Sequence, residues 1–189
     1  MVKVAKLKMP ELKKHLKHYN QKELIKLITE VYKLNDEVKH YLSIKFNAED
    51  TKNDLFEKTK EDIKDEYFPS KETSKLRLGR MKKEIANFKK VTDDYLKTVD
   101  LELFYVEMGT EYTNSFGDIG EGFYYSMVSM FQKVVEECEK DEEVFQHFKD
   151  RLYAVVVNSD GIGWGYHDAL EEIYYSICWL FDDDDEEYI

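Results

Sequence analysis

Residues Asn158–Tyr175 read NSDGIGWGYHDALEEIYY, and a similar stretch, NSFGDIGEGFYY, begins at Asn114. Each places a G-x-G and then an aromatic residue before an apolar pattern with helical spacing, which is typical of a helix start. With one residue removed from the first stretch, Gly120-Glu121-Gly122-Phe123 falls on Gly163-Trp164-Gly165-Tyr166, an offset of 43 residues. Helical-pair repeats of the HEAT and armadillo kind have periods of about 40–47 residues. The two stretches therefore predict equivalent helix starts within an α-α superhelix.

The rest of the chain also has a helical composition. Only 2 of its 189 residues are proline and 8 are glycine, and both residue types interrupt helices. Its 14 tyrosines and 11 phenylalanines recur mainly at helical spacing, which indicates core positions of packed helices. We expect an all-α protein of about eight or nine helices, arranged as an irregular HEAT/armadillo-like superhelix or, as the alternative, as a multi-helix bundle.

Local signals predict where individual helices begin. Pro10 suits the first turn of a short helix, Asn20 and Glu23 form a capping box for a second, and Asn35 suits the cap of a third. Thr92 is expected to cap a later helix. Further helical patterns cover 50–67, 75–90, 119–140 and 141–157, and a last one begins at about residue 165.

The chain length fits a single domain. Its best internal hinge is at residues 69–74, since a helix tends to end before a proline such as Pro69. This hinge separates two possible lobes, residues 1–68 with basic and charged helices and residues 73–182 with the remaining helices. Residues 183–189, DDDEEYI, form an acidic tail that we expect to be disordered.

The charge is unevenly distributed along the chain. Residues 1–90 carry 23 basic and 15 acidic side chains, a net +8, whereas residues 91–189 carry 5 and 25, a net −20. The total of −12 argues against direct nucleic-acid binding. A charged face or a groove that holds a protein partner fits this asymmetry, and the alternative is an acidic decoy that mimics nucleic acid.

The opening MVKVAKLKMPELKKHLKHYN lacks the long apolar run of a membrane span and the cleavage site of a secretory signal. Cys138 and Cys178 lie in apolar helical patterns without a CxxC spacing, which predicts two buried thiols in a reducing compartment. We therefore expect a cytoplasmic protein.

A divalent-metal site is the sharpest chemical hypothesis for the two glycine loops. His167 and Glu171 are four residues apart on one helix face with Asp168 beside them, and Asp118 and Glu121 complete a ligand set if the loops are neighbours. The simpler interpretation is a pair of helix starts, in which Asp118 and Glu121 form a capping box. Neither loop has the lysine or hydroxyl residue of a phosphate-binding loop.

No catalytic set is assembled in the sequence, so we favour a non-enzymatic protein-interaction or scaffold protein. Trp164, Tyr166 and Tyr175 are its candidate contact residues, because aromatic side chains are enriched at protein interfaces. The alternative is a metal-dependent or small-molecule-binding enzyme with its site at the two loops. No other cofactor is predicted.

Three segments carry a resemblance to a known family: LKKHLKHYNQKELIKLITEVYKLNDEVKHYLSIKF from Leu12, LFYVEMGTEYTNSFGDIGEGFYYSM from Leu103, and GIGWGYHDALEEIYY from Gly161. They resemble the bacterial domain-of-unknown-function 6155 family, whereas residues 50–99 match it less clearly. The resemblance implies a small, all-helical, cytoplasmic bacterial protein. It implies no activity, substrate or ligand.

Overall fold

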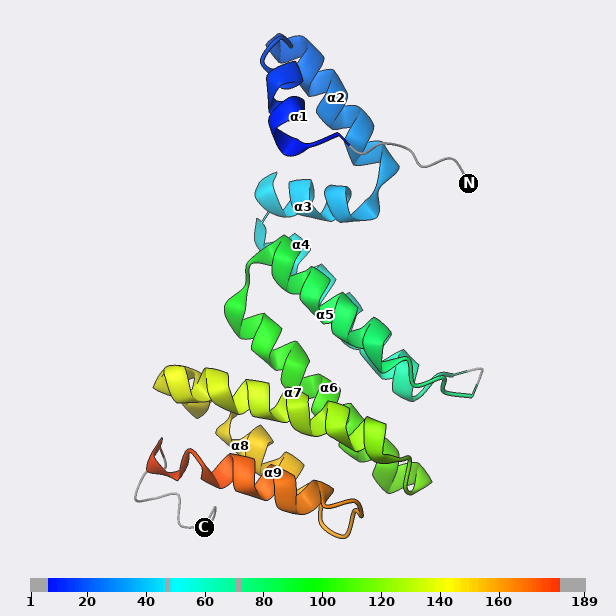
Figure 1. Ribbon diagram of the computed structural model, residues 1–189, viewed down its shortest axis with the longest axis vertical. Coiled ribbons are helices and arrows are strands. Elements are labelled where there is room, and N and C mark those ends of the chain that lie inside the picture. Colours follow the sequence, from blue (N-terminus) through cyan, green and yellow to red (C-terminus); the bar gives the residue numbers. More distant parts are fainter. Residues whose placement is uncertain (1–6, 47, 71–72, 181–189) are drawn as a thin grey trace. The chain divides into compact units, whose positions relative to one another are not determined.

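The computed structural model describes residues 7–46, 48–70 and 73–180, and its regular elements there are nine α-helices and one short 3-10 helix, without a strand (Figure 1). The all-α prediction is confirmed. The superhelical arrangement stays a prediction. The helices are α1 Met9–Leu16, α2 Gln21–Leu34, α3 Asp36–Phe46, α4 Ala48–Tyr67, α5 Leu78–Thr92, α6 Tyr95–Phe116, α7 Glu121–Lys140, α8 Glu142–Asn158 and α9 Tyr166–Tyr175, followed by the 3-10 helix Cys178–Leu180.

The chain divides into two compact units, a first unit that ends at Thr51 and a second unit that begins at Lys52. The boundary lies inside α4, upstream of the hinge expected at residues 69–74. Contacts across that stretch join α4 to α5 within the second unit. The hydroxyl of Ser74 donates to the main-chain oxygen of Glu66 at 2.7 Å, and the Glu66 carboxylate accepts three hydrogen bonds from the Arg77 guanidinium.

Helix starts in the first unit follow the sequence signals. The main-chain N–H of Glu23 donates to Asn20 Oδ1 at 3.0 Å, and the N–H of Asn20 donates to Glu23 Oε2 at 2.8 Å. This confirms the predicted capping box. Asn35 Oδ1 accepts from the N–H of Glu37 at 2.7 Å, as its predicted capping role requires. Pro10 lies in the first turn of α1, where its missing N–H has no helical partner to lose.

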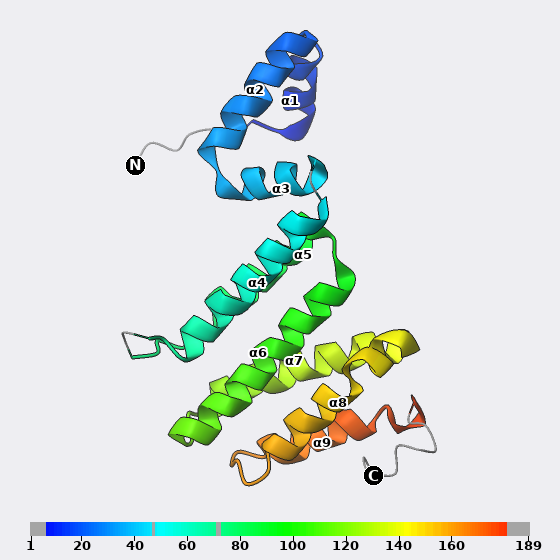
Figure 2. The same ribbon diagram turned by 180° about the vertical axis from the view of Figure 1, so that it is seen from behind.

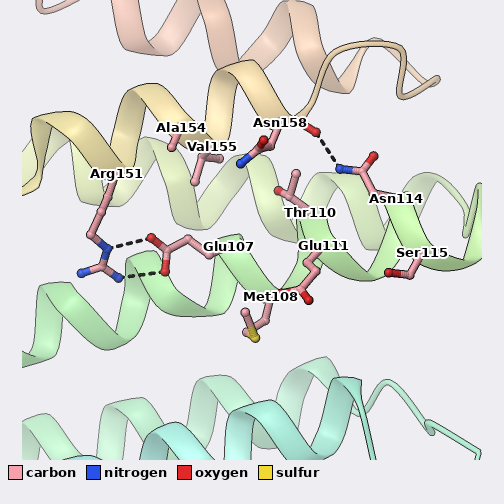
Figure 3. A pocket seen from close by; sticks show the side chains of 10 residues that line it. All are labelled: Glu107, Met108, Thr110, Glu111, Asn114, Ser115, Arg151, Ala154, Val155 and Asn158. Atoms are coloured by element: carbon pink, nitrogen blue, oxygen red, sulfur yellow. Dashed lines mark hydrogen bonds and ion pairs between the residues drawn. The ribbon is translucent and has the colours of Figure 1, made fainter.

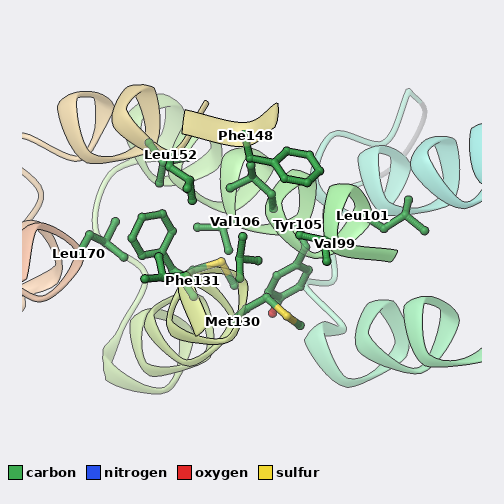
Figure 4. Close-up of a cluster of buried hydrophobic side chains, with 14 of the residues drawn as sticks. Val99, Leu101, Tyr105, Val106, Met130, Phe131, Phe148, Leu152 and Leu170 are labelled. Carbon is green, nitrogen blue, oxygen red and sulfur yellow. The ribbon is translucent and has the colours of Figure 1, made fainter. Parts of the chain in front are cut away.

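The core of the second unit is built around α6, which packs against α5, α7 and α8 (Figure 2). Apolar side chains from four helices meet there (Figure 4), and the labelled members are Val99, Leu101, Tyr105, Val106, Met130, Phe131, Phe148, Leu152 and Leu170. A fully buried side chain of this size contributes roughly 1.5–3 kcal/mol to folding. The second unit therefore has a substantial core of its own.

Close packing inside this core requires a glycine in the middle of α6. A Cβ added at Gly109 would collide with the sulfur of Met127 and lie 3.3 Å from the Tyr67 hydroxyl oxygen. That hydroxyl donates to the main-chain oxygen of Tyr105 at 3.2 Å. Gly109 thus lets α7 and the end of α4 approach the backbone of α6.

Two predicted helix caps are wrong. Thr92 is the last residue of α5, and α6 is capped by Asp94, whose Oδ1 accepts from the N–H of Lys97 at 3.1 Å. Helix α7 begins at Glu121 after Gly120, which provides no side-chain cap, so Asp118 and Glu121 do not form a capping box. Instead, Asp118 accepts a hydrogen bond from the Tyr124 hydroxyl at 3.2 Å.

The described chain ends in a short α-helix, a turn and a 3-10 helix. Helix α9 ends at Tyr175, and the following turn and 3-10 helix leave Cys178 and Trp179 exposed. The prediction of two buried thiols is therefore confirmed for Cys138 and wrong for Cys178. The predicted acidic tail, residues 183–189, lies outside the described residues. Among the helices that are described, none has the length and hydropathy needed to cross a membrane.

Candidate functional site

The two glycine loops are neighbours in the structure, as the metal hypothesis requires. Asn114 Nδ2 donates to the main-chain oxygen of Asn158 at 2.7 Å, which joins the residues at which the two motifs begin. Further along the loops, a Cβ added at Gly163 would lie 3.4 Å from a carboxylate oxygen of Asp118. The two loops therefore form one surface at one end of the α6–α9 helices.

The predicted metal ligands do not converge on this surface. Glu121, Asp168 and Glu171 are exposed on their helices, and the carboxylate of Asp118 is held by Tyr124. The described part of the chain contains no group of three or more His, Cys, Asp or Glu side chains that could hold a metal ion. A metal centre made of these five residues is therefore not assembled.

His167 instead links α9 to the end of α8. Its Nδ1 lies 2.9 Å from the hydroxyl oxygen of Ser159, a fully buried residue. That hydroxyl has a single proton, which it donates to the main-chain oxygen of Val156 at 2.6 Å. With the Ser159 proton donated to Val156, the tautomer of His167 that completes this contact is the one with Nδ1–H as the donor. This side chain stabilises the loop between the two helices.

The three candidate aromatic contact residues lie in different environments. Trp164 is 61% exposed and has a left-handed backbone with φ of 64°, an uncommon conformation for a bulky residue. Tyr166 is in the core, with its hydroxyl 2.8 Å from that of Thr110, and burial raises the pKa of its phenol. Tyr175 is half-buried, and its ring centroid is 5.3 Å from that of Tyr174. Only Trp164 lies fully at the surface.

The first unit has a surface that the sequence did not identify as a candidate site. Ile44 is its one buried side chain among the residues described there, and many large apolar side chains are exposed. They are Leu7, Met9, Leu12, Tyr19, Ile25, Ile28, Val31, Tyr32, Leu34, Tyr41 and Phe46. The sequence of α2 has an apolar stripe, which is a pattern that favours a core-facing side. In the structure, Leu24 and Leu27 of this stripe are half-buried, whereas Ile28 and Val31 are exposed.

Part of this surface is a groove between α2 and α3, with a volume of about 340 Å³. Its lining consists of Ile28, Thr29 and Tyr32 from α2 and Leu42, Ser43 and Phe46 from α3. The i and i+4 residues of each helix are apolar or aromatic, Ile28 and Tyr32 on α2 and Leu42 and Phe46 on α3, so each helix presents an apolar ridge to the groove. Residues 7–51 also carry nine lysines and seven carboxylates, which gives the surroundings of the groove a small positive charge.

The second unit has a larger pocket, of about 510 Å³, between α6 and α8 (Figure 3). It is lined by Glu107, Met108, Thr110, Glu111, Asn114 and Ser115 from α6 and by Arg151, Ala154, Val155 and Asn158 from α8. At one end, Arg151 binds Glu107 through two hydrogen bonds of 2.7 and 2.8 Å and Asp100 through a third of 2.9 Å. The Asn114–Asn158 bond closes the other end.

None of the candidate site residues named from the sequence lines either cavity. The N-S dipeptide that begins both glycine motifs is a signal that points to Asn114 and Asn158. No comparable signal exists for Glu107 and Arg151, which lie 44 residues apart in separate helices. The groove of the first unit was missed because its residues have the pattern of a buried helix face.

Comparison with known proteins assigns the chain to a family. A family model described as a family of unknown function (DUF6155) matches residues 7–177, which include most of both units, the groove and the pocket. Neither the curated proteins nor the solved structures contain a match to the chain. The comparisons therefore provide no activity, ligand or partner for either cavity.

Proposed function

The chain belongs to the DUF6155 family of unknown function, and we propose that it is a protein-interaction or scaffold protein that binds an amphipathic helix of another protein in the α2–α3 groove. The observation that carries this proposal is the apolar surface of the first unit, in which Ile44 alone is buried among the residues described there. Contiguous exposed apolar surface on a soluble protein commonly marks a binding site.

The shape of the groove favours a helical occupant. Two helices border it with side chains one helical turn apart, Ile28 with Tyr32 and Leu42 with Phe46. An amphipathic helix laid between such ridges places its own residues at i, i+3, i+4 and i+7 against them. This packing would cover Ile28, which is 52% exposed, and Phe46, which is 82% exposed.

The charge of the first unit favours acidic residues beside the apolar face of the partner. Lysines outnumber carboxylates in residues 7–51, and Lys45, which adjoins Phe46 in sequence, has its ammonium 6.0 Å from the centre of the Tyr41 ring. Lysine ammonium groups at a rim steer association and select partners more than they add affinity. We therefore infer that the partner helix carries Asp or Glu beside its apolar positions.

Photo-crosslinking tests this proposal directly. Benzoylphenylalanine replaces Tyr32 in the groove, or, as the control, Glu30, an exposed residue of α2 outside the groove. After irradiation in cells that produce the protein, mass spectrometry identifies the crosslinked peptide. We expect the Tyr32 position to label an amphipathic acidic segment of another protein. Crosslinks confined to this chain or to a second copy of it, or labelling equal to that at Glu30, would overturn the proposal.

A pair of charge substitutions supplies a second test. Ile28→Glu places a carboxylate in the groove, whereas Leu34→Glu makes the same kind of change at an 81% exposed residue that does not line it. Losing one apolar anchor at an interface costs at least about 1.4 kcal/mol, or tenfold in affinity. We expect Ile28→Glu to reduce recovery of the crosslinked partner about tenfold, and Leu34→Glu to retain it, with helix content by circular dichroism unchanged in both.

We also propose that the α6–α7 and α8–α9 pairs are two copies of one HEAT/armadillo-like helical unit. The 43-residue offset of the glycine motifs supports this, as does the packing of α6 against α8 and of α7 against α9. In α-α superhelices the equivalent helices of successive repeats pack side by side in this way. Solution scattering that fits a compact bundle better than a curved stack would exclude the arrangement.

A further inference from the structure

The pocket between α6 and α8 is held open by polar contacts at both of its ends. All three nitrogens of the Arg151 guanidinium bind carboxylates at one end, and Asn114 binds the main chain of Asn158 at the other. Its volume of about 510 Å³ lies in the range of small-molecule sites, roughly 300–1,000 Å³. The pocket is therefore formed in advance of any ligand.

The charge of the lining excludes an anion. Arg151 is its single cation among the described residues, and Glu107 and Asp100 already neutralise it. An anion would have to displace Glu107 from a two-bond ion pair, which is the strongest kind of polar contact between side chains. The pocket also belongs to the acidic half of the chain, whose net charge is −20 over residues 91–189. A cation is favoured by both the local and the long-range field.

One exposed carboxylate of the lining, Glu111, has no side-chain partner within the described part of the chain. Glu111 makes no hydrogen bond or ion pair with any residue that the structure describes, and Figure 3 shows it on the α6 side next to Met108. The side-chain amides of Asn114, also on α6, and of Asn158 on α8 add oxygen acceptors at the end of the pocket. An ammonium or guanidinium group, which only donates hydrogen bonds, matches such a set.

The remaining lining is apolar. Met108 on α6 and Ala154 and Val155 on α8 provide carbon surface between the two polar ends. We infer that this pocket binds a small organic cation, in which an alkylammonium or guanidinium group pairs with Glu111 and a short carbon chain contacts Met108, Ala154 and Val155. This site is in the second unit and is independent of the protein-binding groove proposed above.

Three probes with the same carbon chain and different charge test the inference. Pentylammonium, pentanol and pentanoate are titrated separately into the full chain labelled with ¹⁵N, and amide shifts are followed by NMR. We expect saturable shifts confined to α6 and α8 for pentylammonium, weaker shifts for pentanol and none for pentanoate. Equal binding of pentanol would show an apolar cavity without cation selectivity, and shifts spread over the acidic surface would show unspecific attraction. Either result overturns the inference.

Two variants and a control assign the binding to this pocket. Glu111→Gln should weaken pentylammonium binding about tenfold, the loss expected for one charge-assisted contact. Ala154→Phe changes no charge and fills the cavity from an exposed position, so it should abolish binding without disturbing the core. Glu121→Gln removes an exposed carboxylate outside the pocket and should leave the affinity unchanged. If Glu111→Gln and Glu121→Gln have equal effects, the assigned site is wrong.

Discussion

Asn114 donates from its side-chain nitrogen to the main-chain oxygen of Asn158, and these residues begin the two similar glycine motifs. Asn114 and Asn158 are 44 residues apart in the sequence. Glu107 and Arg151, which form the ion pair at the other end of the pocket, have the same separation. A constant separation between contacting residues means that α6 and α8 run in the same direction and in register. The pocket between these two helices is consequently bounded by two contacts that lie the same number of residues apart on both helices.

The Asn114–Asn158 bond should contribute measurably to stability. Replacing Asn114 with Ala should lower the free energy of unfolding by about 0.5–1.5 kcal/mol, the usual net value of one hydrogen bond. Asn114→Asp should cost more at pH 7, because a carboxylate cannot donate and repels the carbonyl oxygen. Urea denaturation followed by circular dichroism measures both, with Ser115→Ala as the control. If all three variants are equally stable, the bond has no energetic role.

The ion pair between Glu66 in α4 and Arg77, the residue that precedes α5, should make stability depend on pH. Hydrogen bonds from the Arg77 guanidinium to the buried Glu66 carboxylate hold the pKa of that carboxyl below its usual range. A lowered pKa stabilises the folded state above the unfolded pKa of about 4.3, and this contribution is lost as the pH falls through the folded pKa.

Glu66→Gln should therefore reduce the free energy of unfolding by about 1–3 kcal/mol at pH 7. The difference from the natural chain should narrow as the pH falls below about 4. Urea titrations at pH 7, 5 and 3 test this, with the exposed Glu61→Gln on the same helix as the control. A difference that stays constant over this range would exclude a charged Glu66 as its source.

Alanine substitutions at two helical glycines should change the stability of the protein in opposite directions. Gly109→Ala forces a methyl group against Met127 and Tyr67 in the core, and overpacking of this kind costs about 1–3 kcal/mol. A Cβ at Gly79 in α5 meets no atom within 4 Å, so Gly79→Ala should stabilise by about 0.5–1 kcal/mol through helix propensity. Thermal unfolding of the two variants distinguishes them. Equal shifts would contradict the close packing at Gly109.

The two cysteines should differ in reactivity. Burial, together with the charge of Glu137, raises the pKa of the Cys138 thiol to about 12, so almost none of it is thiolate at neutral pH. Cys178 is exposed. Iodoacetamide should therefore alkylate Cys178 in the folded protein and both cysteines in urea, as peptide mass spectrometry can show. Modification of Cys138 in the folded protein at the rate of Cys178 would contradict its burial.

Local hydrogen bonds could be predicted from the sequence, whereas contacts between distant segments could not. The Asn20–Glu23 capping box needs only residues three apart, so the pattern is sufficient to identify it. The cap of α6 was misplaced because Thr92 and Asp94 are both good caps, and the left-handed backbone at Asp93 decides between them. Sequence spacing gave no sign that His167 would bind Ser159.

The same distinction applies to the candidate sites. The apolar pattern of α2 correctly predicted a helix, but burial depends on what packs against it, and periodicity does not contain that information. Ile28 and Val31 are exposed for this reason. The pocket of the second unit depends on the register between α6 and α8, which the matching N-S dipeptides indicate only when the two motifs are aligned.

The chain has two tryptophans, Trp164 and Trp179, and both residues are more than half exposed, at 61% and 64%. The fluorescence of the folded protein therefore comes from rings that already contact water, and its emission maximum should move little on unfolding. The signal is correspondingly sensitive to anything that covers these rings. A blue shift on mixing with another molecule, retained in Trp179→Phe and lost in Trp164→Phe, would report an encounter at the glycine loops without any added label.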